Sequence, residues 1–287
     1  MIYRRRLSPL HSARAGAGAG YCLALAVAAL VLSNPLALGA VIVALLGAGA
    51  AAGVGGPVRR AALWSLPVAL TIAVINALVT RDGLTVIVRL GDLPLLGHTD
   101  ITLEATVYGA ILGLRAIALI LCGVLYTTAI DPDEMLALFR RVSFRSALSA
   151  SLATRMVPVL MRDARRLADA QRCRPGPPPS RLALMRAACH GVLDRALDVA
   201  AALEVRGYAV AHRPARRRTP YSRHDLGFGG AAAAVVVLAV LARVGGAVPF
   251  TAYPSLHAPA GAGVWAVAVA LVAVALAPFA DRRGLVP

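Results

Sequence analysis

The sequence contains no lysine, and all 30 of its basic residues are arginine. The absence of lysine excludes a Walker A loop, in which a lysine contacts the nucleotide phosphates. It also excludes an enzyme that forms a Schiff base on a lysine amine. If ATP drives this protein, another subunit must therefore hydrolyse it.

Cysteine is scarce, and its spacing fits no metal site. The four cysteines, Cys22, Cys122, Cys173 and Cys189, form no Cys-x-x-Cys pair, so we expect free thiols rather than a disulfide or a bound metal. The six histidines are dispersed, and the sequence holds no His-Glu-x-x-His or Gly-x-Ser-x-Gly motif. We therefore expect no catalytic residue, no metal ligand and no cofactor.

Aromatic residues make up only 5% of the chain, and no aromatic stacking surface accompanies its arginines. The formal net charge of +16 therefore does not indicate a nucleic-acid partner. Hydrophobic residues, in contrast, make up 59% of the chain, and the mean hydropathy is +0.71. This composition is typical of an integral membrane protein whose arginines face anionic lipid.

Six long apolar runs predict six transmembrane helices and an all-α fold. The predicted spans are residues 15–32, 36–54, 61–79, 101–128, 226–242 and 261–280. Residues 80–100 mix polar and apolar types with glycine and proline, so we expect an irregular outer loop there. We divide the chain into an N-terminal membrane part (1–130), a cytoplasmic region (131–225) and a C-terminal membrane part (226–287).

Arginine counting gives the orientation, because cytoplasmic loops of membrane proteins are rich in basic residues. With both termini inside the cell, only Arg81, Arg89 and Arg243 lie outside, and Arg115 lies within a span. We therefore expect a multi-pass protein of the cell membrane with cytoplasmic N- and C-termini.

The cytoplasmic region predicts three helices. The first begins at Asp131, which is followed by proline and two acidic residues in the first turn. The second covers residues 146–174, with a bend at Pro158, and the third covers residues 181–205. The last two carry apolar residues at helical spacing and are therefore amphipathic.

These two amphipathic helices have similar endings. One reads Ala-Gln171-Arg-Cys-Arg174 before a proline, and the other reads Ala-Leu-Glu204-Val-Arg206-Gly207-Tyr. An arginine at a helix C-terminus stabilises the helix dipole by about 0.3–1 kcal/mol. The alternative is an anchor that enters a partner's groove, whose removal typically costs about 2–5 kcal/mol. The residues alone leave both interpretations open.

Two polar residues lie within predicted spans. Arg115 is costly at membrane depth, so either it faces protein, a cavity or a partner, or its span is shifted and places it near an interface. Asn76 is a candidate for a hydrogen bond between helices. Gly49 and Gly53 form a Gly-x-x-x-Gly pattern, which permits close helix packing.

Short motifs along most of the chain resemble a known family. They are Ser8-Pro9-Leu10-His11, Asn76-Ala77-Leu78, Ile101-Thr102-Leu103-Glu104, Gly113-Leu114-Arg115, Thr127-Thr128 before Asp133-Glu134, Arg155-Met156-Val157-Pro158, and the two helix endings. In this order and spacing, the sequence resembles the transmembrane T-component of energy-coupling factor (ECF) transporters, the family that includes the cobalt-transporter permease subunit.

The resemblance implies a scaffold without catalytic activity, which transmits motion from two ABC-type ATPase subunits to a small substrate-binding membrane subunit. Arg174 and Arg206 would be the ATPase contacts, together with Gln171, Glu204 and Gly207. The family's endings are of the Ala-Arg-Gly type, and here the first ending lacks both alanine and glycine. Because proline cannot copy glycine at positive φ, the first ending departs from the family's backbone geometry.

Two other classes of function make different demands on the sequence. A self-contained secondary transporter predicts repeated halves and several ionisable residues within the membrane, whereas only Arg115 lies at depth, with Glu104 near a span end. An integral membrane enzyme predicts clustered His, Asp or Glu at a membrane face, which the sequence does not show. We therefore expect the coupling subunit of an ATP-driven importer of a vitamin or a transition-metal ion.

Overall fold

The computed structural model describes residues 6–80, 85–93, 97–139, 144–173, 175, 181–207, 221–251 and 261–281. The chain divides into two compact units. The membrane unit comprises Met1–Met135 and Tyr221–Pro287, and the hairpin unit comprises Leu136–Pro220.

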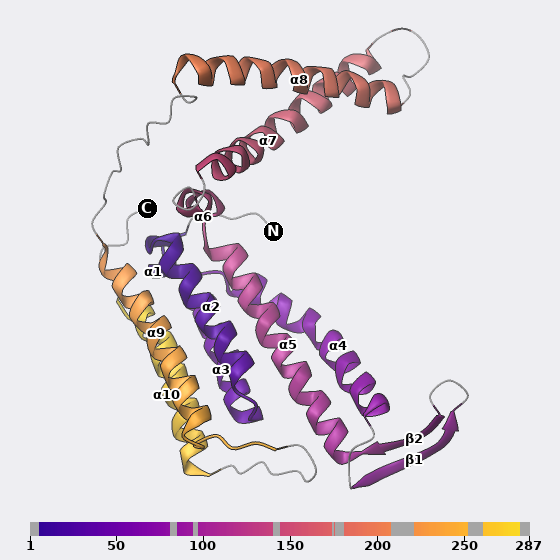
Figure 1. Ribbon diagram of the computed structural model, residues 1–287, viewed down its shortest axis with the longest axis vertical. Helices are drawn as coiled ribbons and strands as arrows, with labels where there is room; N and C mark the ends of the chain where they lie inside the picture. The colour runs from indigo at the N-terminus through magenta and orange to yellow at the C-terminus, as the bar shows by residue number, and fades with distance from the viewer. Residues whose placement is uncertain are drawn as a thin grey trace. The chain divides into compact units, whose positions relative to one another are not determined.

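The membrane unit consists of apolar helices. They are α1 (Pro9–Ser12), α2 (Ala15–Val31), α3 (Pro35–Ala51), α4 (Gly55–Val79), α5 (Leu103–Ala129), α9 (Arg223–Val244) and α10 (Ala262–Leu276), the last followed by the 3-10 turn η1 (Ala277–Phe279) (Figure 1). Four of them are long and apolar enough to cross a membrane: α4, α5, α9, and α10 with η1. At 17 residues each, α2 and α3 are shorter apolar helices. The chain is therefore an α-helical integral membrane protein, as predicted.

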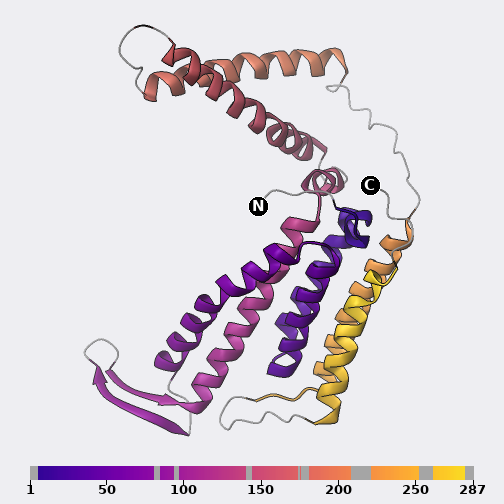
Figure 2. The same ribbon diagram turned by 180° about the vertical axis from the view of Figure 1, so that it is seen from behind.

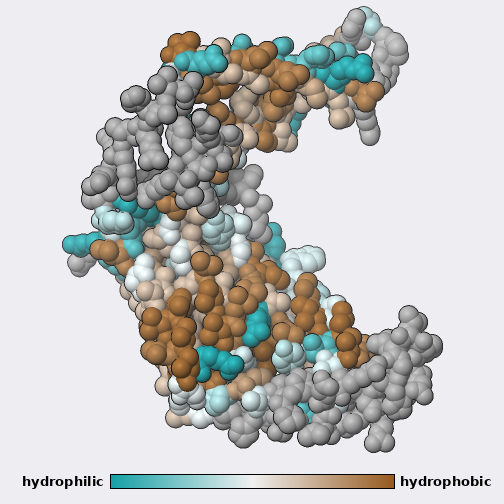
Figure 3. All heavy atoms as spheres, in the orientation of Figure 1, coloured by the Kyte–Doolittle hydropathy of each residue, from teal (hydrophilic) through white to brown (hydrophobic). Residues whose placement is uncertain are grey.

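These helices lie side by side, with α2 and α3 in the middle (Figures 1 and 2). Towards one edge, α2 packs on α9 and α3 packs on α10. Towards the other edge, both pack on α5, and α5 packs on α4. The outer helix α4 carries exposed apolar side chains such as Leu63, Trp64 and Leu70. Figure 3 shows the hydrophobic surface over the membrane unit, as expected for helices that face lipid.

Three aromatic rings join α2 to the C-terminal helices. Tyr21 of α2, Phe228 of α9 and Phe279 of η1 make mutual edge-to-face contacts, with ring centroids 5.1–6.2 Å apart. The hydroxyl of the fully buried Tyr21 donates a hydrogen bond of 2.8 Å to the carbonyl of Ala275. A buried tyrosine needs such a partner, and here its partner fixes α10 against α2.

Helices α4 and α5 approach each other closely at two glycines of α5. A methyl group added at Gly109 would lie 2.8 Å from the carbonyl oxygen of Ala73, and one added at Gly113 would lie 2.9 Å from that of Ala69. These four small residues form two facing small-x-x-x-small patterns. The pattern at Gly49 works differently, because Gly49 packs on Val58 whereas the second glycine, Gly53, lies in the turn after α3 at φ +74°.

A two-stranded antiparallel sheet connects α4 to α5. Strands β1 (Val86–Leu93) and β2 (Gly97–Thr102) pair Arg89 with Asp100 and Leu93 with Gly97. The prediction of an irregular loop was therefore wrong in this segment, where the β-branched residues of β1 favour a strand. At its base, the buried carboxylate of Glu104 accepts the backbone N–H of Thr85 at 3.2 Å.

The hairpin unit consists mainly of two long helices, α7 (Phe144–Arg172) and α8 (Arg181–Val205), which pack on each other. A short helix, α6 (Pro132–Phe139), precedes them. As predicted for a helix start, the Asp131 side chain accepts the backbone N–H of Asp133 at 2.9 Å. The three helices lie within a few residues of the ranges expected from the sequence.

Candidate functional site

The two long helices of the hairpin unit enclose an apolar groove of about 520 Å³. Its lining is mostly aliphatic: Val157, Leu160, Met161, Ala164, Leu167, Ala187, Gly191 and Val192. Asp163 of α7 and Arg195 of α8 also line it, and they form an ion pair that joins the two helices. The groove therefore offers apolar surface beside an ion pair that joins its two helices.

Several apolar side chains of the hairpin unit are exposed, including some that line the groove. Met161 is 56% exposed and Leu197 is 70% exposed. Other exposed members of this set are Val157, Leu182, Met185 and Leu193. Exposed apolar surface of this extent, outside the membrane unit, is typical of a site that binds another protein or a membrane.

Helix α8 ends at Val205, and Arg206 follows as an exposed residue. Its backbone N–H still donates to the carbonyl of Ala202 at 3.2 Å. Gly207 has φ +73°, and its N–H donates to the carbonyl of Glu204 at 2.9 Å. A glycine in this left-handed conformation is the usual way to end a helix. The turn leaves Arg206 and Glu204 exposed at the helix tip.

At the end of α7, Gln171 is half-buried and Arg172 forms an exposed ion pair of 3.6 Å with Asp169. Arg174, the arginine predicted to matter at this tip, lies outside the described residues. The similarity of the two tips therefore stays a prediction.

Arg115 lies within α5 and is half-buried. Its Nε donates to the carbonyl of Ala29 and its Nη2 to the carbonyl of Leu32, both at 3.2 Å. These carbonyls belong to the C-terminal end of α2, where the last turn of a helix leaves carbonyl groups without intrahelical partners. The Arg115 side chain therefore contacts protein and caps α2. Its depth in the membrane stays a prediction.

Asn76 is half-buried in α4 beside Gly109 of α5. Its side-chain carbonyl accepts a hydrogen bond of 3.2 Å from the hydroxyl of Thr80, four residues further along. This bond is local and differs from the interhelical hydrogen bond that we expected. At the α4–α5 contact, Asn76 instead packs against Gly109.

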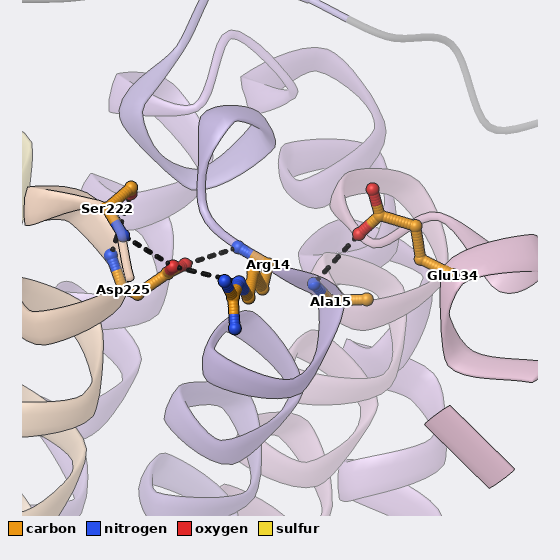
Figure 4. A network of polar contacts seen from close by, with 5 residues as sticks. All are labelled: Arg14, Ala15, Glu134, Ser222 and Asp225. Atoms are coloured by element: carbon orange, nitrogen blue, oxygen red, sulfur yellow. Dashed lines mark hydrogen bonds and ion pairs between the residues drawn. The ribbon is translucent and has the colours of Figure 1, made fainter. Parts of the chain in front are cut away.

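The N-terminus of α2 is held by two carboxylates from other helices (Figure 4). The backbone N–H of Arg14 donates to Asp225 of α9 at 2.7 Å, and that of Ala15 donates to Glu134 of α6 at 3.1 Å. The residue at the N-cap position, Arg14, makes no side-chain cap of its own. We call these two amides and two carboxylates the α2 clamp.

The Asp225 side of the α2 clamp is reinforced by further contacts. The buried Asp225 also pairs with the Arg14 side chain at 3.2 Å and accepts the N–H of Ser222 at 2.9 Å. The Arg14 guanidinium lies 4.6 Å from the centre of the Tyr221 ring. A carboxylate at a helix N-terminus typically stabilises the helix by about 0.3–2 kcal/mol.

Sequence reasoning missed the α2 clamp. It assigned Glu134 to the start of its own helix, whereas the carboxylate reaches α2. The sequence contained one signal for it. The residue at the N-cap of α2 is not Ser, Thr, Asp or Asn, so this helix start, which follows the turn at Ser8–Ser12, needs a cap from elsewhere in the chain.

Within the described part of the chain, no group of three or more His, Cys, Asp or Glu side chains could hold a metal ion. The described cysteines are free thiols, with Cys22 and Cys122 buried and Cys173 and Cys189 exposed. The candidate sites in the described part of the chain are therefore apolar surfaces, helix tips and helix caps.

Comparison with curated proteins finds no match. A family model described as CbiQ, cobalt transport protein, matches residues 7–217. The match includes the helices from α1 to α8 and both arginine-containing endings, and it covers well over half of the chain. This multi-pass membrane protein therefore belongs to the CbiQ family of cobalt transport proteins, as its resemblance to ECF-type T-components indicated.

Proposed function

We propose that this chain is the non-catalytic coupling subunit of an ATP-driven, ECF-type importer of a transition-metal ion or a vitamin. Two ABC-type ATPase subunits bind the tips of α7 and α8, and a small substrate-binding membrane subunit binds the apolar surface of the same helices. ATP-driven movement of the ATPases is passed through the hairpin unit to that subunit. The protein lies in the cell membrane with both termini in the cytoplasm.

The observation that carries this proposal is the tip of α8. Arg206 stands exposed directly beyond the helix, and Gly207 turns the chain away at φ +73°. The Arg206 side chain is therefore exposed at the helix tip, where a partner can reach it. A guanidinium presented in this way suits a groove that contains carboxylates.

The apolar groove between α7 and α8 supports the second partner. Met161 lines the groove and Met185 is also exposed, and a surface with methionines adapts to differently shaped partners because the methionine side chain is flexible. The Asp163–Arg195 ion pair keeps the two helices in register under that surface. A membrane subunit that captures the substrate fits this chemistry.

The experiment compares ATPase binding to the full chain and to charge-reversal variants, purified in detergent. Arg206→Glu should weaken binding, and Arg174→Glu with Arg206→Glu should abolish it. Loss of a desolvated anchor costs about 2–5 kcal/mol, which corresponds to a Kd increase of roughly 30-fold or more.

Arg186→Glu is the matched control, because Arg186 is an exposed arginine in the same helix, far from its tip. It changes the net charge of the chain by the same amount as Arg206→Glu. Equal weakening by both variants would mean that only overall charge matters. A normal complex with the double variant would contradict the proposed function.

A further inference from the structure

We propose that the α2 clamp is the joint through which movement of the hairpin unit enters the membrane helices, with Glu134 as a positioning residue for energy coupling. The inference rests on the proposed function, since it concerns how ATP-driven movement reaches the membrane unit. It assigns a role to contacts that are not part of either partner surface.

The first argument is where the chain crosses between the units. It leaves the membrane unit at Met135, one residue after Glu134, and it re-enters at Tyr221, close to Asp225. These two carboxylates bind neighbouring amides at the start of α2, although they lie 119 and 211 residues from them in the sequence. Both connections to the hairpin unit are therefore fastened to the same turn of one helix (Figure 4).

The second argument is the position of α2 in the membrane unit. It packs on α9, α5 and α3, and its side chains Tyr21, Leu25 and Ala28 are fully buried. Close-packed interiors have low compressibility and transmit strain. A displacement applied at the start of α2 therefore moves several membrane helices together.

The third argument is the asymmetry of the α2 clamp. Asp225 is buried and held by the Arg14 side chain and by Ser222, so the re-entry side is fixed. On the exit side, Glu134 is exposed, and the bond described for its carboxylate is the one to Ala15. Removing this one bond should free α6 from α2 while leaving the packing of the membrane unit unchanged.

The test uses Glu134→Ala in the complete complex with its ATPase and substrate-binding subunits, reconstituted in lipid vesicles. Uptake of Co²⁺ and hydrolysis of ATP are measured on the same vesicles. We expect normal assembly and ATP hydrolysis but at least about fivefold less Co²⁺ taken up per ATP, the lower end of typical coupling between sites.

Asp133→Ala is the matched control, because Asp133 is the preceding residue, is also acidic and exposed, and contributes only its backbone N–H to the hydrogen bond described for it. It should leave uptake per ATP unchanged. Glu134→Gln should restore most of the coupling, because its amide oxygen still accepts the N–H of Ala15.

Three results would overturn the proposal. The first is Glu134→Ala matching wild type in uptake per ATP, and the second is Asp133→Ala losing as much uptake per ATP as Glu134→Ala. In the third, Glu134→Ala would fail to assemble while Asp133→Ala assembles, which would make the carboxylate a purely structural cap. A wild-type chain that binds no ATPase would instead refute the proposed function itself, and this inference with it.

Discussion

The close contact between α4 and α5 gives a prediction with a control inside the same helix. In Gly109→Ala, the new methyl group would lie 2.8 Å from the carbonyl oxygen of Ala73 and 3.0 Å from its Cα. Both are backbone atoms, so the helices must separate. Overpacking of this kind costs about 1–3 kcal/mol. Alanine also gains about 1 kcal/mol of helix propensity over glycine, so the net effect is a loss of up to about 2 kcal/mol.

Gly123→Ala is the control, because Gly123 also lies in α5 and a methyl group there meets nothing within 4 Å. It should gain the helix propensity without the clash. The two variants should therefore differ by about 1–3 kcal/mol, and Gly109→Ala should have the lower Tm. Thermal unfolding of the detergent-purified chain, followed by circular dichroism, measures both. Equal Tm values would refute the close approach of α4 to α5.

Two further substitutions test the caps and contacts of α2. Arg115→Lys keeps the charge, but a lysine ammonium cannot span the carbonyls of Ala29 and Leu32. The loss of one charge-assisted hydrogen bond should lower the free energy of unfolding by about 1.5–3 kcal/mol. An unchanged Tm would show that α2 needs no such cap. Tyr21→Phe keeps the edge-to-face ring contacts and removes the hydrogen bond to Ala275, so unfolding should become easier by about 0.5–1.5 kcal/mol. A larger loss would mean that the substitution disturbs the ring packing as well.

The helices were predictable because their limits are set by local chemistry. The turn before α3 has Asn34, whose side chain caps the helix by accepting the N–H of Leu36, and Pro35 at the first helical position. The last long helix of the hairpin unit was expected at residues 181–205, and α8 has these limits. Apolar runs and the glycine or proline residues that interrupt them therefore predict where each helix begins and ends to within a few residues.

The partners of polar side chains were not predictable, because they depend on which helices become neighbours. Glu134 reaches Ala15 across 119 residues, and Arg115 reaches Ala29 across 86 residues. No local pattern distinguishes a carboxylate that caps its own helix from one that caps another. The same limit applies to close packing, where Gly109 and Gly113 face α4 but the equally spaced Gly49 and Gly53 do not both lie on a helix face.

The two ends of α2 show one electrostatic arrangement supplied by three different helices. Its N-terminus, with partial positive charge, receives carboxylates from α6 and α9, and its C-terminus, with partial negative charge, receives the Arg115 guanidinium from α5. A helix of 17 residues is about 25 Å long, so its ends need partners that lipid cannot supply. The planar guanidinium of arginine can bind two carbonyls at once, which a lysine ammonium does less well. The neighbours of α2 thus fix both its ends, and this is what allows a pull on its first turn to move the membrane unit as a body.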